Sequence, residues 1–96
     1  MFGSFASYAG TSVAGQDIKA TQWSTVIGTD VNFHCNKLTF VSEDAVSIKI
    51  NNSTVWCPLL LDPTDSKYKI SFDTNDIKIK NFYVNSNATY WVGFLY

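Results

Sequence analysis

The sequence predicts an all-β fold, a single antiparallel β-sandwich or barrel of about seven or eight short strands. Runs of alternating apolar and polar residues are separated by Asn, Asp, Gly and Pro at intervals of about ten residues, and no segment keeps the helical period. A chain of 96 residues is long enough for one domain only. We therefore expect a β-sandwich domain over residues 21–96, preceded by a flexible, extended N-terminal arm over residues 1–20.

The stretch 38–61 carries the strongest strand pattern. Val46, Ile48 and Ile50 alternate with polar residues, as expected of a strand with one buried face. Asn51-Asn52 follows and favours a tight hairpin turn, because Asn tolerates a positive φ. We expect this stretch to form a β-meander onto which the later strands add. In chain order the expected strands are 22–28, 31–35, 37–42, 45–50, 54–61, 67–72, 77–85 and 88–96.

The strand expected over residues 77–85 changes phase in its middle. Ile77 and Ile79 share one face, whereas Phe82 belongs to the other. One extra residue between these halves would bring both onto the same side of a sheet. The pattern therefore predicts a β-bulge near Lys80-Asn81.

The last expected strand, 88–96, is apolar on both faces. Trp91 and Leu95 share one face, and the opposite face carries Tyr90, Val92, Phe94 and Tyr96. A central strand that is covered on both sides explains this pattern. Alternatively, one face or the exposed edge docks against another subunit.

Residues 1–20 differ in composition from the rest of the chain. They are rich in Gly, Ala and Ser and keep neither the helical nor the strand period. One interpretation is a frayed terminus. The other is an arm that becomes ordered on a neighbouring subunit, where its isolated apolar side chains fill pockets. Those side chains are Phe2, Phe5, Tyr8 and Val13.

The composition favours a protein partner. Aromatic residues make up 16% of the chain and charged residues only 16%, so we expect another chain to cover part of the aromatic area. The cationic side chains are all Lys, and the absence of Arg argues against a nucleic-acid partner. No apolar run approaches the roughly 20 residues that span a bilayer, so we expect no membrane contact, and the N-terminus lacks the basic region of a signal peptide.

No set of residues predicts catalysis, a metal or a cofactor. His34 and Cys35 would point to opposite faces of a strand, so they cannot act together as base and nucleophile. Cys35 and Cys57 are expected to be buried free thiols, with a single bridge as the alternative. We expect the protein not to be an enzyme. A Ca²⁺ site would have to use turn carboxylates without the order of an EF-hand loop, and these are Asp62, Asp65, Asp73 and Asp76.

The remaining functional candidates are aromatic side chains, which are enriched where protein chains meet. The alternative is a carbohydrate- or receptor-binding module that stacks sugar rings on Trp23 and Trp56. We expect the subunit or partner interface to use aromatic residues of the arm and of the last strand, namely Phe2, Phe5, Tyr8, Tyr90, Phe94 and Tyr96.

Residues 37–96 contain the run KLTFVSEDAVSIKINNS, a turn bounded by Asp and Asn before IKIKNFYV, and the closing ATYWVGFLY. In this order they resemble small virion structural proteins of tailed bacteriophages. The resemblance implies a head decoration, neck, tail or baseplate component that is present in many copies. It implies that the partners are further copies of the chain and other virion proteins, and that assembly takes place in the cytoplasm of the bacterial host.

Overall fold

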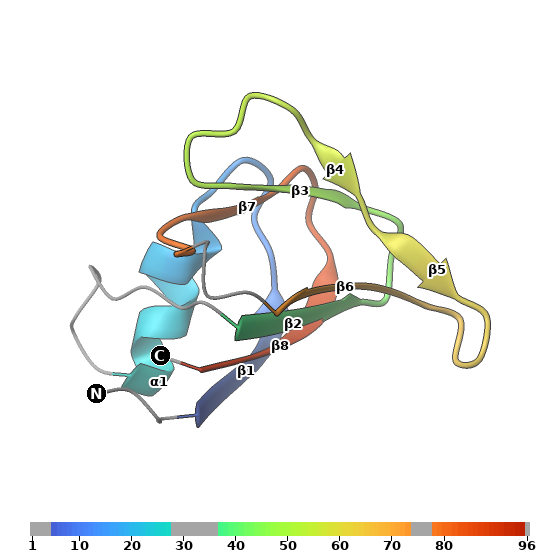
Figure 1. Cartoon of the computed structure of the whole chain (residues 1–96), viewed down its shortest axis with the longest axis horizontal. Coiled ribbons are helices and arrows are strands. Elements are labelled where there is room, and N and C mark those ends of the chain that lie inside the picture. Colours follow the sequence, from blue (N-terminus) through green and yellow to red (C-terminus); the bar gives the residue numbers. More distant parts are fainter. Residues whose placement is uncertain (1–4, 28–36, 74–77, 96) are drawn as a thin grey trace.

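The computed structural model describes residues 5–27, 37–73 and 78–95 and contains two antiparallel sheets (Figure 1). The larger sheet has the strand order β1-β8-β2-β6-β5, and the smaller sheet has the order β4-β3-β7. The predicted all-β class is confirmed. The strands are β1 (Phe5–Thr11), β2 (Lys37–Ser42), β3 (Ser47–Ile50), β4 (Cys57–Pro58), β5 (Leu60–Asp62), β6 (Lys67–Asp73), β7 (Phe82–Val84) and β8 (Thr89–Leu95).

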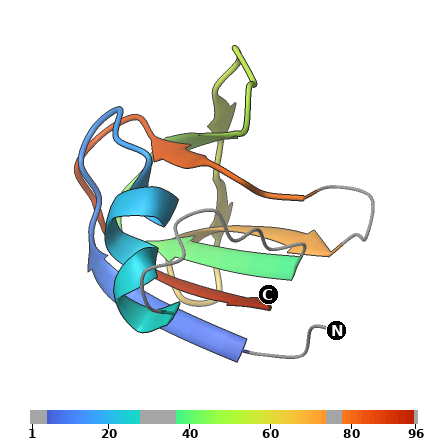
Figure 2. The same cartoon turned by 90° about the vertical axis from the view of Figure 1, so that its left-hand side faces the viewer.

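Aromatic side chains join the layers of the fold. The smaller sheet and a helical segment, residues 19–27, lie over the same face of the larger sheet, the helical segment near β1 (Figures 1 and 2). Phe40 of β2 lies with its ring centroid 5.0 Å from that of Tyr90 in β8 and 5.0 Å from that of Phe82 in β7. Trp23 of the helical segment contacts Phe82 and Phe94, with centroids 5.1 and 5.3 Å apart. Ring pairs of this kind add stability beyond the burial of their area.

The two apolar faces of β8 have different surroundings. Tyr90 and Phe94 are buried in the core, whereas Trp91 and Leu95 are 41% and 38% exposed. β1 and β2 pair with the two edges of β8. The predicted division of the strand into two faces is therefore confirmed, and the interpretation that both faces are covered is wrong.

Residues 5–20 are part of the domain, so the predicted boundary between an arm and the domain is wrong. β1 pairs with β8 along its whole length, from Phe5 opposite Leu95 to Thr11 opposite Thr89. The strand pattern is hard to recognise because two of the inward positions, Ala6 and Gly10, carry a short side chain or none. Ala6 is buried, and Gly10 lies beneath the ring of Tyr8, where an added Cβ would be 2.8 Å from Tyr8 Cε2.

Beyond β1 the chain stays bound to the C-terminal segment. The Ser12 amide donates to the Ala88 carbonyl at 2.9 Å, and the Ala88 amide donates to Ser12 Oγ at 2.9 Å. The Gly15 amide donates to the Val84 carbonyl at 2.9 Å, and Gly15 takes a φ of 76°, which favours glycine. Asp17 then pairs with Tyr83 in an isolated β-bridge.

The strand predicted over residues 22–28 is helical in the described residues. A π-helical turn η1 (Lys19–Trp23) is followed by α1 (Ser24–Ile27). Asp17 caps the turn, since its carboxylate accepts the amides of Lys19 and Ala20 at 3.2 and 3.4 Å. Burial of Ile18 and Trp23 then outweighs the strand preference of the β-branched residues. The strand predicted over residues 31–35 lies outside the described residues.

The stretch 38–61 does not form a meander. β2 lies in the larger sheet and β3 in the smaller, and the strand predicted over 54–61 is divided into β4 and β5, which also belong to different sheets. Pro58 lies where the chain passes from one sheet to the other, and because it has no amide donor it cannot continue a ladder. Asn51 has a φ of 53°, so a turn at this residue is confirmed, but the predicted tight hairpin is wrong, because Ile48 pairs with Cys57 and residues 49–56 lie between them.

The change of phase before β7 is a break in the strand and not a bulge within it. Ile79 and Phe82 are both fully buried, so the two halves do face the same core. The side chain of Asn51 holds the backbone between them: its Oδ1 accepts the Lys80 amide at 2.7 Å, and its Nδ2 donates to the Lys78 carbonyl at 2.9 Å.

Replacing Asp17 by Ala should lower the free energy of unfolding by about 2 kcal/mol. The reason is that the carboxylate caps the helical turn and also accepts the Phe82 amide at 3.1 Å and Asn81 Nδ2 at 2.7 Å. Denaturant unfolding measures the effect. Asp44→Ala, at an exposed carboxylate, is the control and should stay within about 0.5 kcal/mol of the wild type. Equal effects of the two substitutions would contradict this role of Asp17.

Candidate protein-interaction site

The structure divides the residues predicted for the interface. Tyr90 and Phe94 are 3% and 1% exposed, so the prediction that they contact a partner is wrong: they point toward the helical segment and the smaller sheet. Tyr8 is half-buried, with its ring centroid 6.1 Å from that of Tyr90. Phe5 is 65% exposed. Phe2 and Tyr96 lie outside the described residues.

Trp23 is a core residue, so it cannot stack a sugar ring from solvent. Its Nε1 donates to the hydroxyl of Tyr90 at 3.1 Å, and that hydroxyl donates to Oε1 of Gln22. Gln22 Nε2 donates in turn to the Thr11 carbonyl at the end of β1 at 2.9 Å. Burial raises the pKa of Tyr90 above its usual value, so the hydroxyl stays protonated as this chain of donors requires.

Trp56 lies at the surface, with 36% of the residue exposed. The ammonium of Lys49 lies 4.7 Å from the centroid of its ring and 5.5 Å from that of Tyr83. One face of the indole is therefore already occupied by a cation of the same chain, which is a favourable cation–π contact. A sugar would have to displace Lys49 or use the opposite face.

The side of the larger sheet that faces away from the core, which we call the outer face, brings exposed apolar side chains together. Phe5 lies opposite Leu95 in the register, and Trp91 lies between Ala9 of β1 and Val41 of β2. Phe5, Trp91 and Leu95 are 65%, 41% and 38% exposed. Apolar groups on neighbouring strands that remain in contact with water are typical of a surface that another molecule covers.

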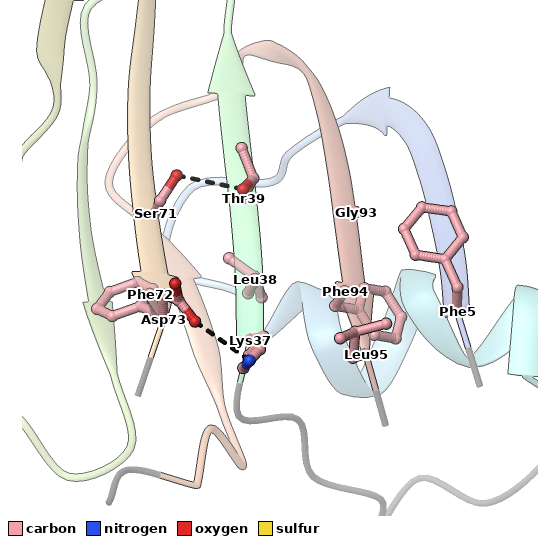
Figure 3. Close-up of a pocket in the computed structure, with 10 residues that line it drawn as sticks. All are labelled: Phe5, Lys37, Leu38, Thr39, Ser71, Phe72, Asp73, Gly93, Phe94 and Leu95. Atoms are coloured by element: carbon pink, nitrogen blue, oxygen red, sulfur yellow. Dashed lines mark hydrogen bonds and ion pairs between the residues drawn. The ribbon is translucent and has the colours of Figure 1, made fainter. Parts of the chain in front are cut away.

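Glycine at position 93 shapes this face. An added Cβ there would lie 2.6 Å from Cη2 of Trp91, so the indole lies flat over the glycine. A depression of about 500 Å³ borders the glycine, and Figure 3 shows Gly93 between Thr39 of β2 and Phe5 of β1. Thr39 Oγ1 and Ser71 Oγ are 3.2 Å apart on its other side.

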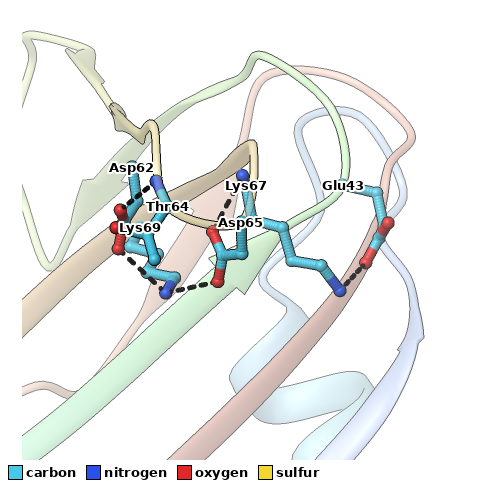
Figure 4. A network of polar contacts seen from close by, with 6 residues as sticks. All are labelled: Glu43, Asp62, Thr64, Asp65, Lys67 and Lys69. Atoms are coloured by element: carbon cyan, nitrogen blue, oxygen red, sulfur yellow. Dashed lines mark hydrogen bonds and ion pairs between the residues drawn. The ribbon is translucent and has the colours of Figure 1, made fainter.

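Ion pairs border the outer face on the side of β5 and β6. Lys69 Nζ lies 3.1 Å from Asp62 Oδ2 and 2.7 Å from Asp65 Oδ2, and Lys67 Nζ lies 2.8 Å from Glu43 Oε2 (Figure 4). The Thr64 amide and Lys69 lower the pKa of Asp62, and Lys69 lowers the pKa of Asp65. At the end of β2, Lys37 Nζ lies 3.5 Å from Asp73 Oδ1.

The residues considered for chemistry are spread over the molecule. Asp62 and Asp65 share Lys69, whereas Asp73 pairs with Lys37 in a separate ion pair. Cys57 is an exposed free thiol, so its predicted burial is wrong. In residues 5–27, 37–73 and 78–95, no group of three or more His, Cys, Asp or Glu residues is arranged to hold a metal ion, and no helix is long and apolar enough to cross a membrane. His34, Cys35 and Asp76 lie outside these ranges.

Sequence reasoning missed the contribution of Gly93 to this face. The signal that could have found it is an aromatic residue two positions before a glycine in a strand, since such residues share a face. The chain contains this pattern twice, as Tyr8 before Gly10 and Trp91 before Gly93. In both cases the ring covers the glycine, inward in β1 and outward in β8.

Comparisons with known proteins add no further assignment: no protein family, no curated protein and no solved structure matches the chain.

Replacing Gly93 by Ala should move the Trp91 indole off the outer face and change the free energy of unfolding by less than about 1 kcal/mol. The reason is that the new methyl group meets the far end of a flexible, half-exposed side chain. The NMR resonance of the Trp91 indole N–H reports the movement. Gly10→Ala is the matched control and should cost more, about 1–2 kcal/mol, because the Tyr8 ring packs inward. An unchanged Trp91 resonance would contradict the contact.

The ion pairs of Lys69 with Asp62 and Asp65 predict that the stability of the fold depends on pH. A carboxylate with a lowered pKa in the folded state stabilises the fold above its unfolded pKa, near 3.8, and this contribution disappears as the pH falls through the lower folded value. Lys69→Gln should therefore be less stable than the wild type at neutral pH, and the difference should shrink below pH 3.8. Denaturant unfolding at a series of pH values measures it. A difference that does not change with pH would show that these ion pairs do not contribute.

Proposed function

We propose that the protein is a non-enzymatic structural protein that assembles in many copies within the virion of a tailed bacteriophage. Its outer face docks on neighbouring protein chains. The observation that carries this proposal is the exposure of Phe5, Trp91 and Leu95 on adjacent strands of one sheet face. The resemblance of residues 37–96 to small virion structural proteins supports the assignment of this assembly to a virion.

The arrangement of polar groups on the outer face supports a protein partner. Phe5, Trp91 and Leu95 lie on β1 and β8, and the ion pairs of Lys67 and Lys69 lie toward the opposite edge, on β5 and β6. Protein interfaces combine an apolar patch with a polar rim, and here the ion pairs form such a rim on one side of the apolar patch. The rim carries both signs of charge in pairs, so it would orient a partner without attracting a polyanion.

The sugar-binding alternative has less support from the geometry. Sugar binding requires aromatic rings whose faces are open to solvent, so that a sugar ring can stack on them. Trp23 is buried, and Lys49 covers one face of Trp56. Trp91 presents an exposed indole, but it lies between Ala9 and Val41 and over Gly93, whose side-chain positions offer a sugar no hydrogen bonds.

Sedimentation velocity over a concentration series tests the docking face. We expect the wild type to form species larger than a dimer, and we expect the double variant W91S/L95S to lose them. Truncation of an anchoring Trp at the centre of an interface costs at least about 2 kcal/mol, or roughly 30-fold in affinity. The control is Trp56→Ser, which removes an indole of similar exposure from the loop before β4 and should assemble as the wild type does.

Two outcomes would contradict the docking face. Identical sedimentation of the wild type and W91S/L95S would show that the outer face does not mediate assembly. Binding of the wild type to immobilised glycans, lost in W91S/L95S, would assign the same face to carbohydrate instead.

The virion assignment has a separate test. Quantitative mass spectrometry of purified phage particles whose genome encodes this chain should find it in many copies per particle. Absence of the chain from the particles would contradict the assignment to a virion and would leave the docking face to the sedimentation experiment.

A further inference from the structure

β1 differs from the other sheet edges in the described part of the chain. It is seven residues long, and FASYAGT contains no charged residue and no proline. β5, at the opposite edge of the same sheet, has three residues and ends in Asp62, and β4 has two residues and includes Pro58. In the smaller sheet, Asp17 bridges to Tyr83 beside β7. Short edges, charges and prolines prevent pairing with other chains, and β1 has none of these features.

The hydrogen bonds to β8 determine which groups of β1 point outward. The Ser12 amide donates to the Ala88 carbonyl, so position 12 belongs to a hydrogen-bonded pair. Hydrogen-bonded and non-hydrogen-bonded pairs alternate along an antiparallel ladder. The amides and carbonyls of Ser7 and Ala9 therefore point away from β8, and both residues are exposed. The Thr11 carbonyl, which also points outward, accepts Gln22 Nε2 and marks the end of the open edge.

We propose that β1 pairs antiparallel with β1 of a second copy, about a two-fold axis at Tyr8, so that the two larger sheets become one continuous sheet. Ser7 then lies opposite the partner's Ala9, and Ala9 opposite the partner's Ser7. In each of these two pairs both amides donate to the facing carbonyls, which gives the isologous contact that a two-fold dimer requires. The proposal rests on the proposed function, because it names one of the neighbouring chains in the assembly.

The side chains of β1 fit this register. Ser7 and Ala9 are small, so at these two central positions the second strand meets no bulky or charged group on the outer face. Tyr8 lies opposite the partner's Tyr8 on the inner side, in a non-hydrogen-bonded pair, where side chains approach most closely. Phe5 lies opposite the partner's Thr11. The outer faces of the two copies join, and the apolar surface around Phe5 and Trp91 is doubled.

Ala9→Pro tests the pairing, with the solution mass measured by light scattering over a concentration series. Proline removes the outward amide at position 9 and leaves the bonds to β8 intact, and proline is tolerated where an edge amide faces solvent. By symmetry the dimer loses two hydrogen bonds, so we expect its dissociation constant to rise at least about tenfold. The control Ala9→Ser keeps the amide and should dimerise as the wild type does.

A pair of double variants tests the register and does not depend on the folding of the proline variant. S7K/A9K places a lysine opposite a lysine in both pairs and should be monomeric at low salt. S7K/A9E places the introduced lysine of each copy opposite the introduced glutamate of the other and should restore the dimer. Registers that place position 7 opposite itself, or position 9 opposite itself, would keep like charges together and would not be restored by S7K/A9E.

The contradicting results are specific. A wild type that stays monomeric at all concentrations, a dimer that Ala9→Pro leaves unchanged, or equal behaviour of S7K/A9K and S7K/A9E would overturn the pairing. If species larger than a dimer persist in Ala9→Pro but disappear in W91S/L95S, the β1 pairing is wrong and the proposed function stands. If the dimer forms and W91S/L95S sediments as the wild type does, the docking face is wrong and the β1 pairing stands.

Discussion

The pairing of the N-terminal segment with the C-terminal segment is the constraint on which the rest of the structure depends. β1 pairs with β8, and the chain then follows the C-terminal segment through Ser12 and Gly15 to the bridge between Asp17 and Tyr83. This path brings the helical segment over the inner face of the larger sheet, where Trp23 fills the space between Phe82 and Phe94. These contacts join residues that are 59 to 90 positions apart, so a large loop must close before they stabilise the fold.

The same pairing divides the aromatic residues between the core and the surface. Once β8 is paired on both edges, Tyr90 and Phe94 point toward the helical segment and the smaller sheet, and Trp91 and Leu95 are left on the outer face. β1 adds Phe5 to this face opposite Leu95. The exposed apolar surface is therefore a consequence of the strand order. The core buries only some of the many aromatic residues, and the others remain at the surface.

Much of the fold follows from local patterns, and the errors have a common physical cause. Residues 37–42 and 67–72 alternate clearly and form β2 and β6, with small differences at their ends. β1 escapes prediction because alanine and glycine at inward positions give no apolar periodicity. The local pattern predicts a strand where the helical segment lies, because the cap at Asp17 and the burial of Trp23 depend on the distant β7 and β8.

The candidate site is predictable only in part for a related reason. Alternation in β8 separates its two faces, but both faces are apolar, so the sequence does not say which of them other elements cover. The predicted interface lies on the face of Tyr90 and Phe94, whereas the helical segment and the smaller sheet cover that face. The outer face is recognisable only once the position of the helical segment is known.

Site-resolved hydrogen exchange of the native protein tests most directly whether the N-terminal segment is an integral part of the fold. The amides of Ala6, Tyr8 and Gly10 donate to β8 in the ladder described above, so their exchange should require global unfolding, with the same free energy as the amide of Phe40 in β2. Exchange of these three amides at free energies near zero, while Phe40 stays protected, would show that residues 5–11 fray from a domain that folds without them, and would contradict the account.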